Sequence, residues 1–410
     1  MRTRLRWAIG LVVVLHGVIH LLGAAEGLSS SVVTPLTQPI SNTMGVTWLA
    51  AAVLVVVAGV MLIRRTRWWW VVGAAAAVTS QAVVLSSWTD AKAGTIVNLV
   101  LLIAAGYGLA AQGPASLAAE YRRRVETAQS QPTRGVVTEG DLAGLPPAVA
   151  AYVRASGAVG QPRVVDVRAR LHGRIRASAS TPWMPFTAEQ FNTYGPTTSR
   201  LFLMDATKFG LPVDVLHVFV GPSASMRVRL CSVLPVVDAA GPVMDRGETV
   251  TVFNDLCVLA PAALVDAPIT WQRTDARRVR AEFTRGPHTV SAELLFNDDD
   301  ELVDFVSDDR SRASADGRHF TAQRWSTPLS AYRAFGSRRV ATSGEGRWHA
   351  PDPEGEFSYV EMTTDDIAYN AGERQRPTAA GRRFVNPAGQ CTTVPRSAPC
   401  APSTSAAGPG

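Results

Sequence analysis

Residues 46–63 read VTWLAAAVLVVVAGVMLI, a nearly continuous apolar run without a charged side chain. A helix that rises about 1.5 Å per residue needs roughly 20 such residues to cross ~30 Å of hydrocarbon. The backbone must also satisfy its own hydrogen bonds there, which a helix does and an open strand does not. Three further stretches have the same character: Trp7–Ala25, Trp68–Trp88 and Thr95–Ala111. The sequence therefore predicts four transmembrane helices.

The basic residues predict how these helices are oriented. Arginines precede the first stretch, separate the second from the third and follow the fourth: Arg2, Arg4, Arg6, Arg64, Arg65, Arg67, Arg122, Arg123, Arg124 and Arg134. With an even number of spans, all three groups face one side, which the positive-inside rule assigns to the cytoplasm. We expect a multi-pass protein of the inner (plasma) membrane whose N-terminus and large C-terminal domain are cytoplasmic. The first stretch alone also suits a signal peptide, but the other three favour an anchor.

The formal net charge of +6 is concentrated beside the membrane. Beyond Gly135 basic and acidic residues occur in nearly equal numbers. A basic juxtamembrane segment suits anionic lipid headgroups, so the expected partner is the lipid bilayer. Protein partners cannot be named from the sequence, and we predict no nucleic-acid binding.

Motifs for common cofactors and reactions are absent from the sequence. It has no Walker loop, dinucleotide fingerprint, zinc-hydrolase helix motif or nucleophile elbow. The four cysteines form no metal-ligand spacing; Cys231 and Cys257 fit a hydrophobic core, and pairing of Cys391 with Cys400 stays open. We therefore expect no cofactor. The pattern favours a protein that is not an enzyme, without excluding a reaction.

Composition divides the chain into four parts. We predict a four-helix transmembrane domain over 1–120, a basic juxtamembrane linker over 121–140, a soluble β-rich domain over 141–370 and a disordered tail over 371–410. In the third part apolar residues alternate with polar ones, as in half-buried strands, and Gly-Pro and Asn-Asp turns separate the strands. The fold class is thus a membrane all-α domain joined to a soluble α+β, mainly antiparallel β domain.

One helix interrupts the predicted strands. Asp245 and Glu248 have the spacing of a capping box that leads into Val250–Leu264. The same two carboxylates would also suit acid–base chemistry, but capping already explains their spacing. A long antiparallel meander tends to curl, so we expect a curved sheet or half-barrel with this inserted helix and an apolar pocket.

Two groups of motifs carry a resemblance. The sequence is similar to a family of uncharacterised bacterial membrane proteins, known only as a domain of unknown function, which implies no activity. The motifs are His16-x-x-x-His20, Trp88-x-Asp90-Ala91-Lys92, Pro182-Trp183-x-Pro185-Phe186-x-Ala188-Glu189-Gln190, Gly241-Pro242-x-Met244-Asp245 and Gly344-Glu345-x-x-Trp348. More distantly, the pattern Tyr332…Gly336…Thr342…Glu345 resembles the half-barrel of bacterial lipoprotein carriers, which wrap a curved sheet around acyl chains.

These features suggest a binding function. The leading hypothesis is a non-enzymatic, membrane-anchored binding module whose curved sheet holds an apolar small molecule, either a lipid or an isoprenoid. Its candidate ligand-binding residues are Trp183, Phe186, Glu189, Phe191, Glu345 and Trp348. The two glutamates suit surface positions on alternating strands equally well, so their role stays open.

The alternative hypothesis comes from the first span. His16 and His20 lie one helical turn apart on one face. Ionisable residues in a membrane face protein or a cavity, so the pair could bind a metal or serve a redox centre, together with Gln81 and Asn98. The simpler interpretation is that these side chains hold the helices together by hydrogen bonds.

Overall fold

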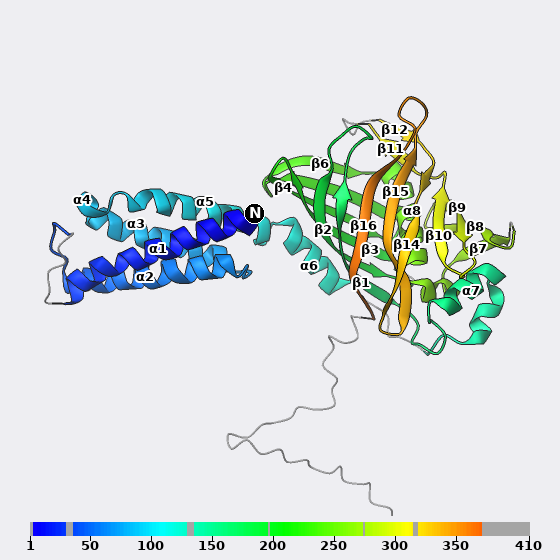
Figure 1. Ribbon diagram of the computed structural model, residues 1–410, viewed down its shortest axis with the longest axis horizontal. Helices are drawn as coiled ribbons and strands as arrows, with labels where there is room; N and C mark the ends of the chain where they lie inside the picture. Colours follow the sequence, from blue (N-terminus) through cyan, green and yellow to red (C-terminus); the bar gives the residue numbers. More distant parts are fainter. Residues whose placement is uncertain are drawn as a thin grey trace, which may run out of the picture. The chain divides into compact units, whose positions relative to one another are not determined.

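The structure is a computed structural model that describes residues 3–29, 36–128, 135–195, 197–273, 275–314 and 319–370. The predicted tail over 371–410 lies outside these residues. The first part of the chain forms helices α1 (Thr3–Leu28), α2 (Asn42–Ile63), α3 (Trp69–Ser86), α4 (Trp88–Ala91) and α5 (Gly94–Gln112). By length and composition, four helices can cross a membrane, which confirms the predicted spans (Figure 1).

Small residues allow these helices to approach one another closely. Gly27 of α1 and Gly45 of α2 face each other, and a Cβ atom on Gly27 would lie 2.6 Å from the Cα atom of Gly45. Lipid tails are as apolar as the helices, so close backbone packing supplies much of the attraction between membrane helices. The α1–α2 pair is therefore fixed by the absence of side chains at its contact.

The segment after α5 is more ordered than a linker. Helix α6 (Leu117–Thr127) packs Leu117 and Tyr121 against Phe191, Leu201 and Leu216 of the sheet described below. A 3-10 helix, η1 (Glu139–Gly144), and α7 (Pro147–Ala155) follow. The linker expected from residue 121 thus begins as a helix, because its basic side chains leave an apolar face that the sheet covers.

One antiparallel sheet of 14 strands dominates the rest of the chain, with the order β6-β5-β4-β3-β2-β1-β16-β15-β13-β10-β9-β8-β7 and β14 paired to β15. Its strands are β1 (Asp166–Ile175), β2 (Met184–Thr193), β3 (Ser199–Lys208), β4 (Leu211–Val220), β5 (Ser223–Leu230), β6 (Leu234–Ala240), β7 (Ile269–Arg273), β8 (Arg278–Arg285), β9 (His288–Phe296), β10 (Leu302–Ser307), β13 (Trp325–Ser326), β14 (Leu329–Phe335), β15 (Arg338–His349) and β16 (Glu356–Tyr369). A separate pair joins β11 (Ser311–Ala313) and β12 (Phe320–Ala322).

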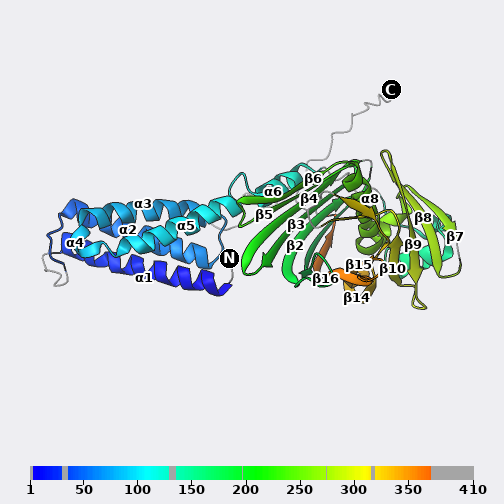
Figure 2. The same ribbon diagram turned by 90° about the horizontal axis from the view of Figure 1, so that it is seen from above.

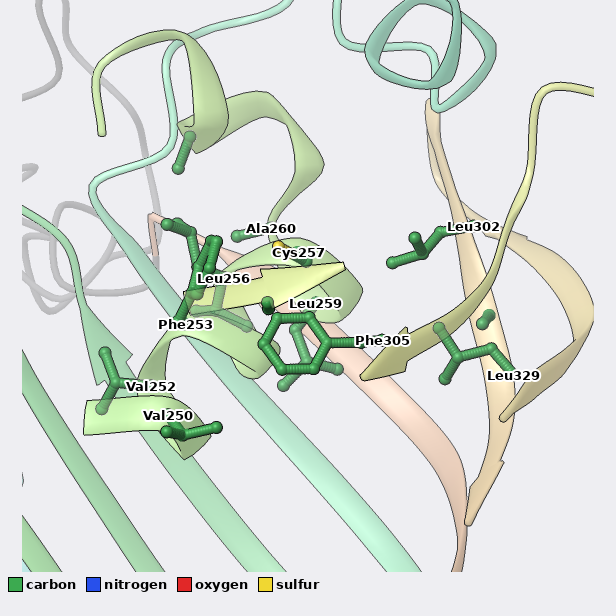
Figure 3. Close-up of a cluster of buried hydrophobic side chains, with 14 of the residues drawn as sticks. Val250, Val252, Phe253, Leu256, Cys257, Leu259, Ala260, Leu302, Phe305 and Leu329 are labelled. Atoms are coloured by element: carbon green, nitrogen blue, oxygen red, sulfur yellow. The ribbon is translucent and has the colours of Figure 1, made fainter. Parts of the chain in front are cut away.

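The sheet curls around helix α8 (Pro242–Leu259), which is followed by the 3-10 helix η2 (Pro261–Val265) (Figure 2). We call the face that carries α8 the concave face and the other the outer face. Phe253 of α8 stacks on Phe283, with ring centres 5.1 Å apart, and meets Phe305 edge-on at 5.2 Å. Figure 3 shows the apolar side chains of α8 gathered in this core. The predicted curved sheet with one inserted helix is confirmed.

The start of α8 differs from the prediction. The helix begins at Pro242, after Gly241 with φ 112°, and Asp245 lies in its first turn instead of capping it. The Asp245 carboxylate accepts a hydrogen bond from the backbone N–H of Ala224 at 2.6 Å. The capping-box interpretation is therefore wrong, because proline suits the first turn of a helix and moves its start upstream.

Candidate functional site

A buried cluster of charged and polar side chains lies between the concave face and α8. Side chains two residues apart in a strand point to the same face. Arg200 of β3 is two residues from Phe202, and His217 of β4 is two residues from Phe219, both of which belong to the core around α8. Arg200 and His217 therefore lie on the concave face, as does Gln190 of β2. We call Gln190, Asn192, Arg200, His217, Glu248 and Asp255 the concave cluster.

Arg200 is the centre of the concave cluster. Its Nε donates to Asp255 Oδ2 at 2.6 Å, and its second contact is with Glu248 Oε2 at 3.3 Å. The side-chain amide of Gln190 also donates to Asp255 Oδ2, at 2.6 Å. Only 7% of Arg200 is exposed. One guanidinium thus pairs with two buried carboxylates, and these contacts offset part of the cost of removing the charges from water.

His217 is neutral in this environment. Its pKa is lowered to about 4, chiefly by burial; Glu248 opposes this shift, and the charges of Arg200 and Arg310 add to it. Burial alone would raise the pKa of Glu248, but Arg200, His217 and Arg310 outweigh it and hold that pKa below its usual range. The concave cluster therefore combines two carboxylates, one guanidinium and a neutral imidazole.

Arg310 extends the concave cluster toward aromatic side chains. Its guanidinium carbon lies 4.5 Å from the ring centre of Trp325 and 5.7 Å from that of Trp348. The buried nitrogen atoms without a hydrogen-bond partner among the described residues include Arg310 Nε, Trp325 Nε1 and His217 Nδ1, the last of which lies 3.8 Å from Glu248 Oε1. Buried polar groups are nearly always paired, so unpaired donors beside apolar rings point to a place that receives a ligand.

The structure divides the predicted ligand residues between two faces. Phe186 and Trp348 are buried in the core of the concave face. Phe191 lies on the outer face beneath α6, and the neighbouring Glu189 is exposed on that same face. Strand β2 thus sends residues from one short motif to opposite sides of the sheet, because its side chains alternate.

Trp183 and Glu345 contact charged partners. Trp183 lies between two guanidinium groups, those of Arg174 at 4.5 Å and Arg176 at 4.3 Å from its ring centre. Glu345 accepts a hydrogen bond from Arg347 Nε at 2.9 Å and one from the Ser358 hydroxyl. Of the six residues, the structure therefore brings only Phe186 and Trp348 into the core around α8.

A second polar cluster joins the membrane helices. His20 Nε2 lies 2.7 Å from Ser80 Oγ, His16 Nε2 lies 3.2 Å from both Ser80 Oγ and Asn98 Oδ1, and His20 Nδ1 donates to the backbone oxygen of His16 at 3.0 Å. Asn98 Nδ2 donates to Gln81 Oε1 at 3.0 Å. We call His16, His20, Ser80, Gln81 and Asn98 the membrane cluster.

The predicted proximity of these residues is confirmed, but they form hydrogen bonds with one another. Each ring nitrogen of the two histidines that has a partner meets a serine, an asparagine or a backbone oxygen. Across the described ranges, no group of three or more His, Cys, Asp or Glu side chains is placed to hold a metal ion. The geometry is that of hydrogen bonds linking α1, α3 and α5, and the metal role of His16 and His20 stays a prediction.

The family of the chain follows from its β-rich part. Residues 135–362 match the family of unknown function DUF6544, which is more than half of the chain. The chain belongs to this family. The DUF6544 match contains the whole concave cluster with Arg310 and Trp325, whereas the membrane cluster precedes it. No curated protein matches the DUF6544 chain.

Solved structures resemble the DUF6544 chain only distantly. A putative outer membrane lipoprotein-sorting protein domain from Vibrio parahaemolyticus shares 10% identity and a TM-score of 0.29 over 51% of this chain and 86% of that one. A DUF1329 family protein from Desulfovibrio piger shares 13% identity and a TM-score of 0.31, over 55% of this chain and 92% of that one. A LolA superfamily protein from Nitrosomonas europaea shares 9% identity and a TM-score of 0.25, over 53% of this chain and 92% of that one. The DUF6544 match confirms the resemblance to a family of unknown function.

Sequence reasoning missed most of the concave cluster in this DUF6544 chain. Arg200, His217 and Asp255 stand far apart in the sequence and belong to no motif. One signal was available: Arg200 and His217 occupy inward positions of alternating strands, where apolar residues are expected. Asp255 and Asn254 likewise interrupt the apolar half of α8.

Proposed function

We propose that the protein is a membrane-anchored binding module that holds an apolar ligand, a lipid or an isoprenoid, on the concave face of its curved sheet. The observation that carries this proposal is the set of buried nitrogens of Arg310, Trp325 and His217 without a hydrogen-bond partner, with Arg310 lying on the Trp325 and Trp348 rings. The ligand's apolar part would pack on the indole rings and Phe186, and its polar end would accept hydrogen bonds from Arg310.

The hydrogen bonding of the two arginines supports a binding role for Arg310. Arg200 is committed to Asp255 and Glu248, whereas the guanidinium of Arg310 rests on aromatic rings. A guanidinium on an aromatic face keeps its edge donors directed outward and is weakly hydrated, which suits it to bind carboxylate or phosphate oxygens. A lipid or isoprenoid whose polar end is anionic would therefore complete this site.

The membrane helices support the proposal that the ligand comes from the bilayer. Four spans hold the β-rich domain beside a bilayer, so the effective concentration of lipids at the domain is high. We extend the proposal to orientation: the domain lies on the cytoplasmic side, as the distribution of arginines predicts. An activity reporter fused at the C-terminal end would be inactive if the domain lay outside.

Photo-crosslinking of the full-length protein tests the binding site. The protein in phospholipid vesicles is exposed to photoactivatable analogues of a phosphatidylglycerol and of a polyprenyl phosphate, and cross-linked peptides are mapped by mass spectrometry. We expect adducts on the peptides that contain Trp325 and Trp348. Adducts confined to the membrane helices would overturn the proposal.

A pair of arginine variants sharpens this experiment. Arg310→Gln removes the guanidinium beside Trp325, so capture of the probe on the concave face should fall severalfold. Arg324→Gln is the control, because Arg324 is exposed and paired with Asp308 at 2.8 Å. Equal capture by both variants would show that Arg310 does not hold the polar end of the ligand.

A further inference from the structure

Two hairpin tips at one end of the sheet expose large apolar side chains. In the turn between β3 and β4, Phe209 is 85% exposed and Leu211 is 48% exposed. In the turn between β5 and β6, Val233 and Leu234 are 67% and 58% exposed. We call these four residues the tip patch. Scattered single apolar residues are normal on a surface, but four on adjacent tips are a patch that needs a partner.

Strand pairing brings the two tips together. Val213 of β4 pairs with Leu230 of β5, and the Cys231 N–H donates to the backbone oxygen of Pro212 at 2.8 Å. Phe209 has a φ of 51°, a backbone conformation that is unfavourable for an aromatic residue. The fold thus holds a bulky ring at a strained turn position although the ring packs against little of the protein. Contacts with the rest of the protein therefore do not account for a phenylalanine at this position.

Helix α6 shows which end of the sheet carries the tip patch. Arg229, two residues before the β5–β6 turn, donates to the backbone oxygen of Ala115 at 3.1 Å. Arg227, two residues before Arg229 in β5, pairs with Glu120 of α6 at 2.5 Å. Helix α6 therefore starts near the tips and runs away from them along the outer face, where Leu117 and Tyr121 fix it.

The chain connects this end of the sheet to the bilayer. The fourth candidate span covers Gly94–Thr127; its apolar helix α5 ends at Gln112, and its basic part, α6, begins at Leu117. The five Cα–Cα steps from Gln112 to Leu117 cannot extend further than about 18 Å, so the start of α6 stays near the end of α5. The tips that lie beside Ala115 are consequently held at the level of the lipid headgroups.

We propose that the tip patch inserts into the headgroup and upper acyl region of the membrane that the helices span. Phe209 supplies an aromatic ring of the kind that interfacial segments bury at the acyl boundary, and Leu211, Val233 and Leu234 supply apolar area. Lys208 and Arg229 flank the patch and suit anionic headgroups. The occupant of the patch is a lipid bilayer, and its contact is separate from any ligand on the concave face.

The two ends of strand β4 provide a matched test. Leu211 at the tip end and Val220 at the other end are apolar and exposed to similar extents, 48% and 41%. Each is replaced by cysteine in full-length protein carrying Cys231→Ser, Cys391→Ser and Cys400→Ser, while the fully buried Cys257 is retained. Both variants are labelled with an environment-sensitive fluorophore and reconstituted in vesicles of phosphatidylethanolamine and phosphatidylglycerol.

Quenching by spin-labelled lipid then reports contact with the bilayer. We expect the label at residue 211 to lose most of its fluorescence and the label at 220 to lose almost none. The added double substitution Phe209→Asp with Val233→Asp should restore the fluorescence at 211 without changing thermal unfolding. The same result in phosphatidylcholine would assign the contact to apolar insertion. Equal quenching at both ends, or none at 211, would overturn the proposal.

Discussion

The membrane cluster and the concave cluster satisfy buried polar groups in opposite ways. In the membrane, His16, His20, Ser80 and Asn98 share hydrogen bonds within one small group of neutral side chains. On the concave face, Arg200 bridges two full negative charges. An unpaired charge is costly in lipid, so neutral groups join the helices there, whereas the interior of the β-rich domain holds charges that are paired.

The difference also separates what each cluster can do. Every inward-facing polar atom of the two histidines in the membrane cluster meets a partner, which is what a structural contact requires. The concave cluster continues into Arg310 and Trp325, where donors lack a partner within the described chain. We therefore assign stability to the first cluster and binding to the extension of the second.

The largest expected effect is the loss of Arg200. Arg200→Leu leaves Asp255 and Glu248 buried without their counter-charge, which typically costs about 3–5 kcal/mol of folding free energy. The measurement is chemical unfolding of the detergent-solubilised protein followed by tryptophan fluorescence. As a control, Arg170→Leu removes an exposed pair with Asp366 and should change little. Similar losses in both variants would contradict a special role for the buried pair.

An intermediate effect is expected in the membrane cluster. Ser80→Ala removes the hydroxyl that meets both histidines and Asn98, so the bundle should lose about 1–2 kcal/mol, as interhelical hydrogen bonds in membranes do. Unfolding in mixed micelles of increasing dodecyl sulfate content measures this loss. Ser86→Ala is the matched control, because the Ser86 hydroxyl bonds only to Val83 of its own helix. An unchanged midpoint for Ser80→Ala would remove the structural assignment.

The smallest effect concerns acid sensitivity. Since the pKa of His217 falls from 6.5 to about 4 on folding, the unfolded chain binds a proton more readily, and stability is lost as the pH falls through this window. At pH 5.5 the loss relative to pH 7.5 should be about 1 kcal/mol, given about 1.4 kcal/mol per pKa unit. His217→Gln should abolish this component in pH-dependent thermal unfolding.

The difference between the parent and the variant is the quantity to compare. Burial raises the pKa of Asp304 to about 6, so this group stabilises the fold as the pH falls from about 6 toward 3.8, opposite in sign to His217. Both proteins retain Asp304, and its contribution cancels in the difference. A variant whose acid sensitivity equals that of the parent would show that His217 is not the responsible group.

Local sequence patterns predicted the fold better than the site. The apolar runs and the alternation in strands such as β1 depend on neighbouring residues, so each could be inferred from the sequence. Helix α6 was missed because its apolar face consists of few residues among many arginines. The concave cluster was missed because Arg200 and Asp255 meet only after β3 and α8 pack together.

Residues that lie close together in a sequence motif need not share one pocket. Trp183, Phe186, Glu189 and Phe191 lie within nine residues, which suggested one pocket. Strand alternation sends Phe186 to the concave face and Phe191 beneath α6, so proximity in sequence did not become proximity in space. Only the curvature of the whole sheet decides which face becomes the interior, and no single segment encodes that curvature.

The pairing of β1 with β16 has a consequence for synthesis. Val167 pairs with Tyr369, about 200 residues later in the chain, so the ribosome works for roughly 10–40 s between the two strands. Until β16 emerges, β1 has an open edge and its apolar face is incompletely covered beside a membrane. Nascent chains that stall in this interval should be prone to aggregation and proteolysis, and a chaperone that shields strand edges would raise the yield of folded protein.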